Sequence, residues 1–247
     1  MTTTYEPNVV LSTKEYDVVG TRPIRHDGAD KVTGKARYGA DYSARTQLYG
    51  KILRSPHAHA KIKSIDTSKA EVLEGVRAVV THKDFPRALE GDDAVQAMRE
   101  GIMASDRVRF KGHPVAGVAA LNVHIAEEAI GLIEVEYEVL ASVMTTQDAM
   151  KDGAPILYDD LRTDELGETV EGNTNVAQHI QFSVGDIDKG FAEADVIVER
   201  EFNTATVHQG YIEPHNCTVD WNKDGRVYIW NSTQAPFDVR DQTAQIL

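Results

Sequence analysis

The chain has 247 residues, 41% of them hydrophobic, which is enough to bury the core of one large domain or two ordinary ones. Its formal charge of −13 at pH 7 argues against nucleic acid or an anionic membrane as a partner, because both require a basic surface. The single cysteine, Cys217, excludes internal disulfides and any iron–sulfur cluster held by this chain alone.

No apolar run approaches the roughly 18 to 20 residues that are needed to span a bilayer. The first residues, Met1 to Thr13, lack the basic and apolar segments of a secretory signal. We therefore expect no membrane partner and a cytoplasmic location.

The first part of the chain predicts loops and then strands. Residues 1–17 are polar without a clear period and are expected to form an N-terminal arm. Residues 20–42 are rich in glycine and charge, which predicts a loop followed by short strands. Residues 48–65 alternate apolar and polar side chains, as two half-buried strands do.

A short helix is expected over residues 67–74, where Gly75 can end it, and a strand over 76–81. Residues 86–106 are acidic and patternless, so we expect a loop there.

Residues 108–121 predict a strand, a turn and a nearly all-apolar second strand that is covered on both faces. Asn122 can cap a helix whose Ile125 and Ala129 share one face, and residues 133–140 then alternate as a strand.

The last third begins with residues 158–179, whose few large apolar residues indicate an interdomain connection. A helix over 185–194 and a strand over 196–204 are expected next. Residues 219–231 predict a hairpin, and Pro236 suits the first position of a final helix.

Four stretches resemble the a/b hammerhead domain of the xanthine dehydrogenase and aldehyde oxidase family: RPIRHDGADKVTGKARYGADY, ILRSPHAHAKIKSID, GVRAVVTHKDFP, and GHPVAGVAA with AEEAIGLIEVEYEVL. The start of the molybdopterin-binding domain of that family is similar to GDIDKGFAEADVIVEREF, YIEPHNC and STQAP. The resemblance covers the chain from about Val18 to Leu247. It implies an α+β fold, with a hammerhead domain over 18–157, a linker over 158–179 and an incomplete mixed α+β molybdopterin-binding domain over 180–247.

The resemblance also implies a function. Enzymes of this family oxidise heterocycles, aldehydes, coenzyme A thioesters or carbon monoxide at a molybdenum–pterin cofactor, commonly in its cytosine dinucleotide form. Electrons leave through [2Fe-2S] clusters to FAD on other domains or subunits. The implied partners are the remaining part of the molybdenum subunit, an FAD-binding subunit and an iron–sulfur subunit, and the substrate stays open.

In this family a glutamine of an STQ-like segment faces the metal centre, and Gln234 occupies that position. A carboxamide donates and accepts hydrogen bonds without titrating near neutral pH, which suits the role. The alternative is that Gln234 caps the helix that follows it.

Two family features are absent from the sequence: a glycine-rich GGGFGGK-like loop and the glutamate that serves as general base. The final helix also runs to Leu247 without a Gly, Asn or Pro to end it. We therefore expect a split subunit or truncated product that is not a complete catalyst alone. The alternatives are a non-catalytic hammerhead module that docks partner subunits, and a small independent enzyme that acts through Glu213 and a histidine.

The remaining candidates are weaker. The resemblance gives Glu213 of YIEPHN a role in supporting the pocket, distinct from the base, and His208 and His215 are expected to hydrogen-bond near the pocket floor. His57 and His59 would share a strand face as a metal pair does, but they have no third ligand, so no metal site is predicted. Cys217 lies in an alternating stretch and is expected to be a small core residue.

Overall fold

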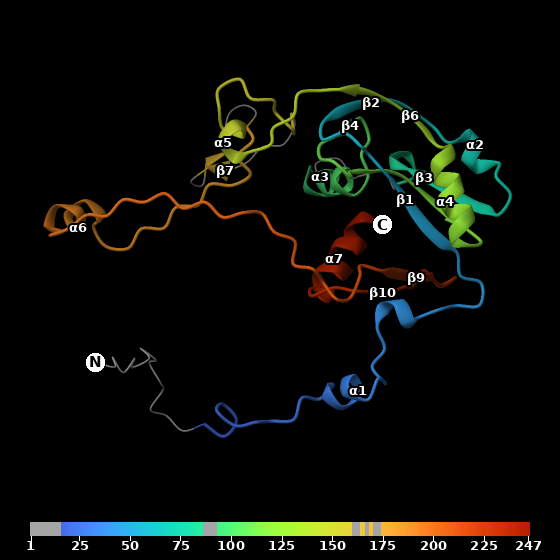
Figure 1. Ribbon diagram of the computed structural model, residues 1–247, viewed down its shortest axis with the longest axis horizontal. Helices are drawn as coiled ribbons and strands as arrows, with labels where there is room; N and C mark the ends of the chain where they lie inside the picture. Colours follow the sequence, from blue (N-terminus) through green and yellow to red (C-terminus); the bar gives the residue numbers. More distant parts are fainter. Residues whose placement is uncertain (1–15, 86–92, 160–163, 166–167, 170–173) are drawn as a thin grey trace, which may run out of the picture. The chain divides into compact units, whose positions relative to one another are not determined.

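The computed structural model describes residues 16–85, 93–159, 164–165, 168–169 and 174–247 (Figure 1). The chain divides into two compact units. The larger unit comprises Ala44–Gly210 and Thr233–Leu247, and the smaller comprises the segment up to Ser43 together with Tyr211–Ser232. Most of the predicted arm, residues 1–17, lies outside the described residues.

Two antiparallel three-stranded sheets form the centre of the larger unit. The first has the order β1 (Tyr49–Arg54), β5 (Pro114–Ala120) and β3 (Val76–Thr81). The second has the order β4 (Arg107–Val108), β2 (Ala60–Asp66) and β6 (Glu134–Val139). The strands expected within 48–65, over 76–81 and over 133–140 are thereby confirmed.

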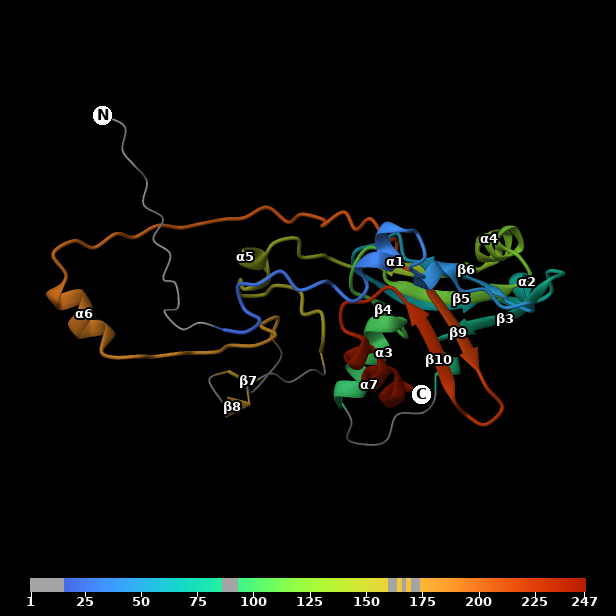
Figure 2. The same ribbon diagram turned by 90° about the horizontal axis from the view of Figure 1, so that it is seen from below.

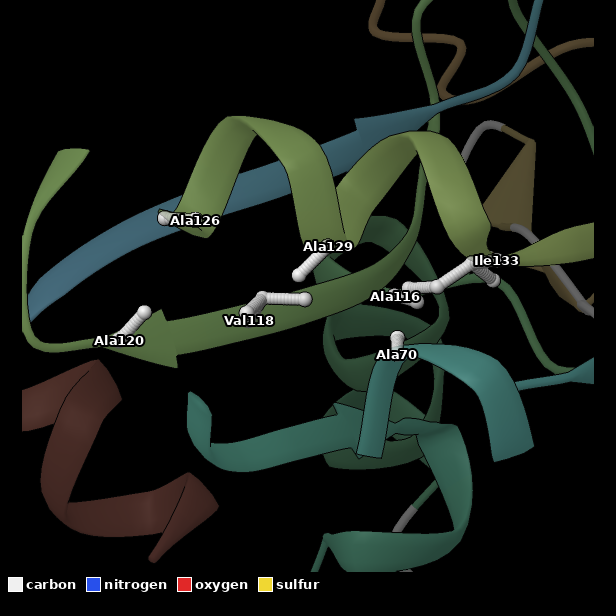
Figure 3. Close-up of a cluster of buried hydrophobic side chains, with 7 residues drawn as sticks. All are labelled: Ala70, Ala116, Val118, Ala120, Ala126, Ala129 and Ile133. Atoms are coloured by element: carbon white, nitrogen blue, oxygen red, sulfur yellow. The ribbon is translucent and has the colours of Figure 1, made fainter. Parts of the chain in front are cut away.

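Helix α4 (Val123–Leu132) covers one face of the first sheet. The side chain of Asn122 accepts a hydrogen bond from the Ile125 amide at 2.9 Å, which confirms the predicted cap. Figure 3 shows the buried cluster beneath the helix. Its members are Ala116, Val118 and Ala120 of β5, Ala126 and Ala129 of α4, and Ala70 and Ile133. Because most of these side chains are alanines, the helix can lie close to the sheet.

The opposite face of β5 belongs to a second cluster. Val115 packs there with Ala60, Ala104 and Val108. Since successive side chains of a strand point to opposite faces, β5 is buried on both sides, as its apolar sequence predicts.

Gly75 follows helix α2 (Ser68–Glu71), which is shorter than the predicted helix over 67–74. Gly75 has φ +96°, and a β-carbon added to it would lie 2.6 Å from Cδ1 of Ile125. We expect Gly75→Ala to destabilise the protein by about 1–3 kcal/mol, because the left-handed backbone and the contact with Ile125 both oppose a side chain.

Gly131→Ala is the matched control, since Gly131 lies in helix α4 and a β-carbon there would meet nothing within 4 Å. It is expected to stabilise the protein by about 0.5–1 kcal/mol. Urea unfolding of both variants measures the difference, and equal effects of the two substitutions would contradict the prediction.

The expected loop over 86–106 is wrong where the structure describes it, because helix α3 (Asp93–Ile102) lies there. Val95, Arg99 and Met103 are buried at a spacing of four residues, which places them on one face of a helical segment. The acidic composition masked this short apolar pattern. Residues 86–92 lie outside the described residues.

A buried ion pair ties α3 to the segment after β4. Nη1 of Arg109 donates to a carboxylate oxygen of Glu100 at 3.2 Å, and both side chains are almost fully buried. Arg109 also donates from Nε to the Leu157 carbonyl at 2.9 Å, with its guanidinium 4.5 Å from the ring centre of Tyr158. The hydroxyl of Ser105 donates to the other Glu100 oxygen.

His113 lies next to this ion pair and is fully buried. Its Nδ1 accepts from the Arg109 amide at 3.2 Å, and its Nε2 lies 2.6 Å from the Glu100 carbonyl, so Nε2 carries the proton. Burial lowers the pKa of His113, the hydrogen bond to the Glu100 carbonyl opposes the shift, and the charge of Arg109 adds to it. The imidazole is therefore held neutral as a structural group.

The smaller unit contains α1 (Gly28–Val32), the 3₁₀ turn η1 (Gly39–Asp41) and a hairpin of β9 (Cys217–Trp221) and β10 (Val227–Asn231). The predicted hairpin is confirmed. The short strands expected within 20–42 are wrong, because this stretch forms α1, η1 and turns, which are held by local bonds such as that from the Tyr38 amide to the Asp41 carboxylate at 2.9 Å.

The remaining elements of the larger unit are short, apart from the last helix. They are η2 (His82–Asp84), α5 (Thr146–Ala149), the paired β7 (Asp164–Glu165) and β8 (Glu168–Thr169), α6 (Ile187–Glu193) and α7 (Pro236–Ile246). Helices α6 and α7 confirm two predictions. The strand expected over 196–204 is wrong: Val196, Val198 and Phe202 are exposed, and no described segment pairs with this stretch. An alternating pattern forms a strand only where a partner strand accepts its hydrogen bonds.

None of the helices in the described part of the chain is both long enough and apolar enough to cross a membrane.

Candidate functional site

The YIEPHN segment and the end of β10 are joined by hydrogen bonds through Ser232. The Asn216 amide donates a hydrogen bond to the Ser232 hydroxyl at 3.2 Å. The same hydroxyl donates to the Pro214 carbonyl at 3.3 Å. The Ser232 amide donates to the Asn216 carbonyl at 3.3 Å. Two segments that lie 18 residues apart are therefore fixed side by side.

The hairpin and η1 support this junction. Asn231 and Cys217 are the terminal pair of the β9–β10 register, so Ser232 and Asn216 continue it directly. The Tyr42 ring stacks on that of Trp230, with the ring centres 3.6 Å apart and the planes 10° from parallel. An added β-carbon on Gly39 would lie 2.3 Å from Oδ1 of Asn216, so a larger residue here would displace the Asn216 side chain.

Gln234 is exposed and lies at the start of α7, in the larger unit. Thr233 Oγ1 accepts a hydrogen bond from the Ala235 amide at 3.0 Å, which holds the turn before Pro236. The cap position of α7 is Ala235, and no side chain caps the helix, so the alternative role of Gln234 as a cap is wrong. Within the described residues the Gln234 carboxamide has no hydrogen-bond partner, which leaves its donor and acceptor groups free.

The three supporting candidates are also exposed. The His215 ring lies edge-on to that of Tyr211, with ring centres 5.5 Å apart. His208 accepts a hydrogen bond at Nδ1 from the Gly210 amide at 2.9 Å. Glu213 is the third candidate, in the same smaller unit as His215.

The histidine pair and the cysteine lie elsewhere than predicted. His57 and His59 occupy the connection between β1 and β2 and not a strand. Nδ1 of buried His59 lies 2.5 Å from the Ala141 carbonyl, and the His57 ring lies edge-on to that of Tyr137. The prediction that Cys217 is a core residue is wrong, because it is exposed on a two-stranded hairpin that leaves the Val219 and Trp221 side chains exposed as well.

Gln234 therefore offers an uncharged polar group at this position. In the parts of the chain that the structure describes, no three His, Cys, Asp or Glu side chains are grouped so that they could hold a metal ion. A carboxamide such as that of Gln234 can donate from Nε2 and accept through Oε1 without a change of charge. It can orient a bound polar group, whereas proton transfer needs a titratable residue.

Comparison with known proteins finds a matching domain family for each half of the chain. Residues 33–141 match the family model of the aldehyde oxidase and xanthine dehydrogenase a/b hammerhead domain, and residues 169–247 match that of the molybdopterin cofactor-binding domain. The sequence is 35% identical over 94% of its length to a probable hypoxanthine oxidase, XdhD, of Escherichia coli O157:H7, of which it covers 27%. The chain belongs to the xanthine dehydrogenase and aldehyde oxidase family.

Further members of the family match over a similar extent. The nicotinate dehydrogenase large molybdopterin subunit of Eubacterium barkeri is 31% identical over 95% of this chain and 52% of its own length. The structure is similar to that of reconstituted CO dehydrogenase from Oligotropha carboxidovorans, with a TM-score of 0.72 and 32% identity over 92% of this chain and 29% of that chain. The chain thus spans between about a quarter and a half of these relatives.

Family membership confirms the α+β fold and the molybdenum cofactor class. His208, Glu213, His215 and Gln234 all fall in the part that matches the cofactor-binding domain. The relatives carry the names of oxidoreductases, several of them subunits, so a non-catalytic docking module is not favoured. Sequence reasoning missed Ser232 as the residue that joins the two segments. Its place in the same STQ segment as the predicted Gln234 was the available signal.

Proposed function

We propose that this chain supplies the hammerhead domain and the first part of the molybdopterin-binding domain of a molybdenum hydroxylase. That enzyme oxidises an organic substrate at a molybdenum–pterin centre. The observation that carries the proposal is the STQ segment within the matched residues 169–247, which carries an exposed carboxamide without a partner among the described residues. The proposed limits are a hammerhead domain over 18–157, a linker over 158–179 and the cofactor domain from 180 onward.

The residues present fit the cofactor. The free carboxamide of Gln234 offers two N–H donors and a carbonyl acceptor, and Thr233 fixes the turn that presents it. When bound, the molybdenum–pterin cofactor supplies the two-electron redox chemistry. Gln234 orients the reacting group by hydrogen bonds and stays uncharged through the reaction, while Glu213, His208 and His215 support the pocket.

The electron route lies on partner polypeptides in this proposal. Iron–sulfur clusters are held by several cysteine thiolates, and this chain has only Cys217. We therefore place the [2Fe-2S] clusters and FAD on an iron–sulfur subunit and an FAD-binding subunit, beside the remaining part of the molybdenum subunit. The cofactor is assigned the cytosine dinucleotide form, and the exposed lone thiol of Cys217 fits a cytoplasmic location.

The test is the metal and pterin content of the protein, purified with the polypeptides that accompany it. Cells grown with molybdate are expected to yield molybdenum and pterin in equal amounts, with cytosine nucleotide released on acid hydrolysis. Cells grown with tungstate provide the control, because the same assembly then lacks turnover of every oxidisable substrate. An assembly that carries neither metal nor pterin would contradict the proposal.

A further inference from the structure

Helix α3 of the hammerhead part contacts helix α7 of the cofactor part, both within the larger unit (Figure 2). Arg99 of α3 is 8% exposed, and its Nη2 donates a hydrogen bond to the Ile246 carbonyl of α7 at 2.9 Å. Ile246 is itself buried. The contact therefore joins the two regions that match different family models, residues 33–141 and 169–247.

The buried Arg99 side chain has few polar partners. Among the residues that the structure describes, no carboxylate forms an ion pair with Arg99, and its Nε has no acceptor. Among the described residues, the Ile246 carbonyl is thus the acceptor that holds the Arg99 side chain.

The position of α7 decides where Gln234 lies. The helix has 11 residues and, at 1.5 Å of rise per residue, a length of about 16 Å. Arg99 holds its C-terminal turn, while Gln234 directly precedes the cap residue Ala235 at its other end. Because a packed helix moves as a rigid body, a shift at Ile246 is passed to the segment that carries Gln234.

We propose that Arg99 is a positioning residue that sets the place of Gln234 at the cofactor by holding the C-terminal turn of α7. This inference rests on the proposed function. It gives the hammerhead part a role in the reaction that its own sequence motifs do not indicate. Arg99 acts through α7 alone and touches no reacting atom.

The experiment compares Arg99→Met and Arg99→Lys in the assembled enzyme, with Arg77→Met, at an exposed position of β3, as the matched control. Arg99→Met is expected to lower kcat by about 10- to 100-fold, as misplaced catalytic groups do, while the molybdenum content stays unchanged. Arg99→Lys keeps one donor and the charge, so it should restore part of the rate. Arg77→Met should leave kcat unchanged.

A second readout does not depend on activity. Hydrogen–deuterium exchange of the α7 amides is expected to speed up about tenfold in Arg99→Met and to stay unchanged in Arg77→Met. Unchanged exchange in α7 would overturn the inference even where the rate falls. If Arg99→Met does not fold, Arg99→Lys must show the smaller loss of rate together with the faster α7 exchange.

A double-mutant cycle with Gln234→Leu separates positioning from general stability. If Arg99 acts through Gln234, Arg99→Met causes little further loss of kcat once Gln234 is already Leu. Equal losses in both backgrounds would overturn the inference and leave the proposed function intact. An assembly without molybdenum, or one in which Gln234→Leu has no effect on the rate, would count against the proposed function itself.

Discussion

Glu100→Gln is expected to lower the free energy of unfolding by about 3 kcal/mol or more, whereas Glu127→Gln is expected to cost much less. Both substitutions remove one negative charge from an ion pair and keep the shape of the side chain. Glu100 pairs with Arg109 in the interior, where the side chains are 13% and 9% exposed. Glu127 pairs with Lys51 at 2.8 Å on the surface, where they are 54% and 40% exposed.

The difference follows from what each loss leaves behind. Without the Glu100 charge, the Arg109 guanidinium stays buried, and its other partners among the described residues are the Leu157 carbonyl and the Tyr158 ring. A buried unpaired charge carries its full desolvation cost. The substitution also weakens the hydrogen bonds of Ser105, because its hydroxyl and its amide both donate to the Glu100 carboxylate. Lys51 merely returns to water when Glu127 is changed.

Urea unfolding of the two variants and of the unchanged protein measures the difference in the free energy of unfolding. An equal slope of that free energy against urea concentration shows that the same transition is compared. Glu100→Ala with Arg109→Met in one chain is the further control, because removing both charges should recover part of the stability. Equal losses for Glu100→Gln and Glu127→Gln would contradict the prediction.

The elements that the sequence predicts well are those whose signals are local. The alternation in 48–65 and the Asn122 cap depend on neighbours within a few residues, and both appear in the structure. The elements that it misses depend on distant partners. Residues 196–204 alternate as a strand does but have no described strand beside them, and Cys217 is exposed because its hairpin has only two strands.

Helix α3 shows the opposite failure. Among its described side chains Val95 and Arg99 are buried, and Met103 follows directly after the helix; an arginine does not count as apolar in a sequence pattern. The sequence also could not predict the contact of Arg99 with the Ile246 carbonyl, because the two residues lie 147 positions apart in the chain. Gln234 could be singled out from its resemblance alone, whereas the Ser232 bonds near it required coordinates.

Gln234→Leu in the assembled enzyme is expected to lower kcat by about 100- to 1000-fold, the usual cost of removing one preorganised hydrogen-bond donor at a reacting centre. Leucine has nearly the same volume but neither donor nor acceptor, so the loss isolates the carboxamide. The kcat of Gln234→Glu is expected to fall by a similar factor, because a carboxylate brings a negative charge and no hydrogen-bond donor near neutral pH. Molybdenum content is measured on every sample, so that the rates refer to loaded enzyme.

The matched control is Gln242→Leu, which makes the same change at an exposed position within α7. It should keep kcat within about twofold, as surface substitutions away from special features do. Several chemically related substrates should be tested. If Gln234 serves the reacting centre, kcat falls by a similar factor for each of them. A loss confined to one substrate, with KM raised and kcat kept, would instead show that Gln234 only contacts that substrate. Full activity of Gln234→Leu with normal molybdenum content would remove every chemical role from the STQ segment.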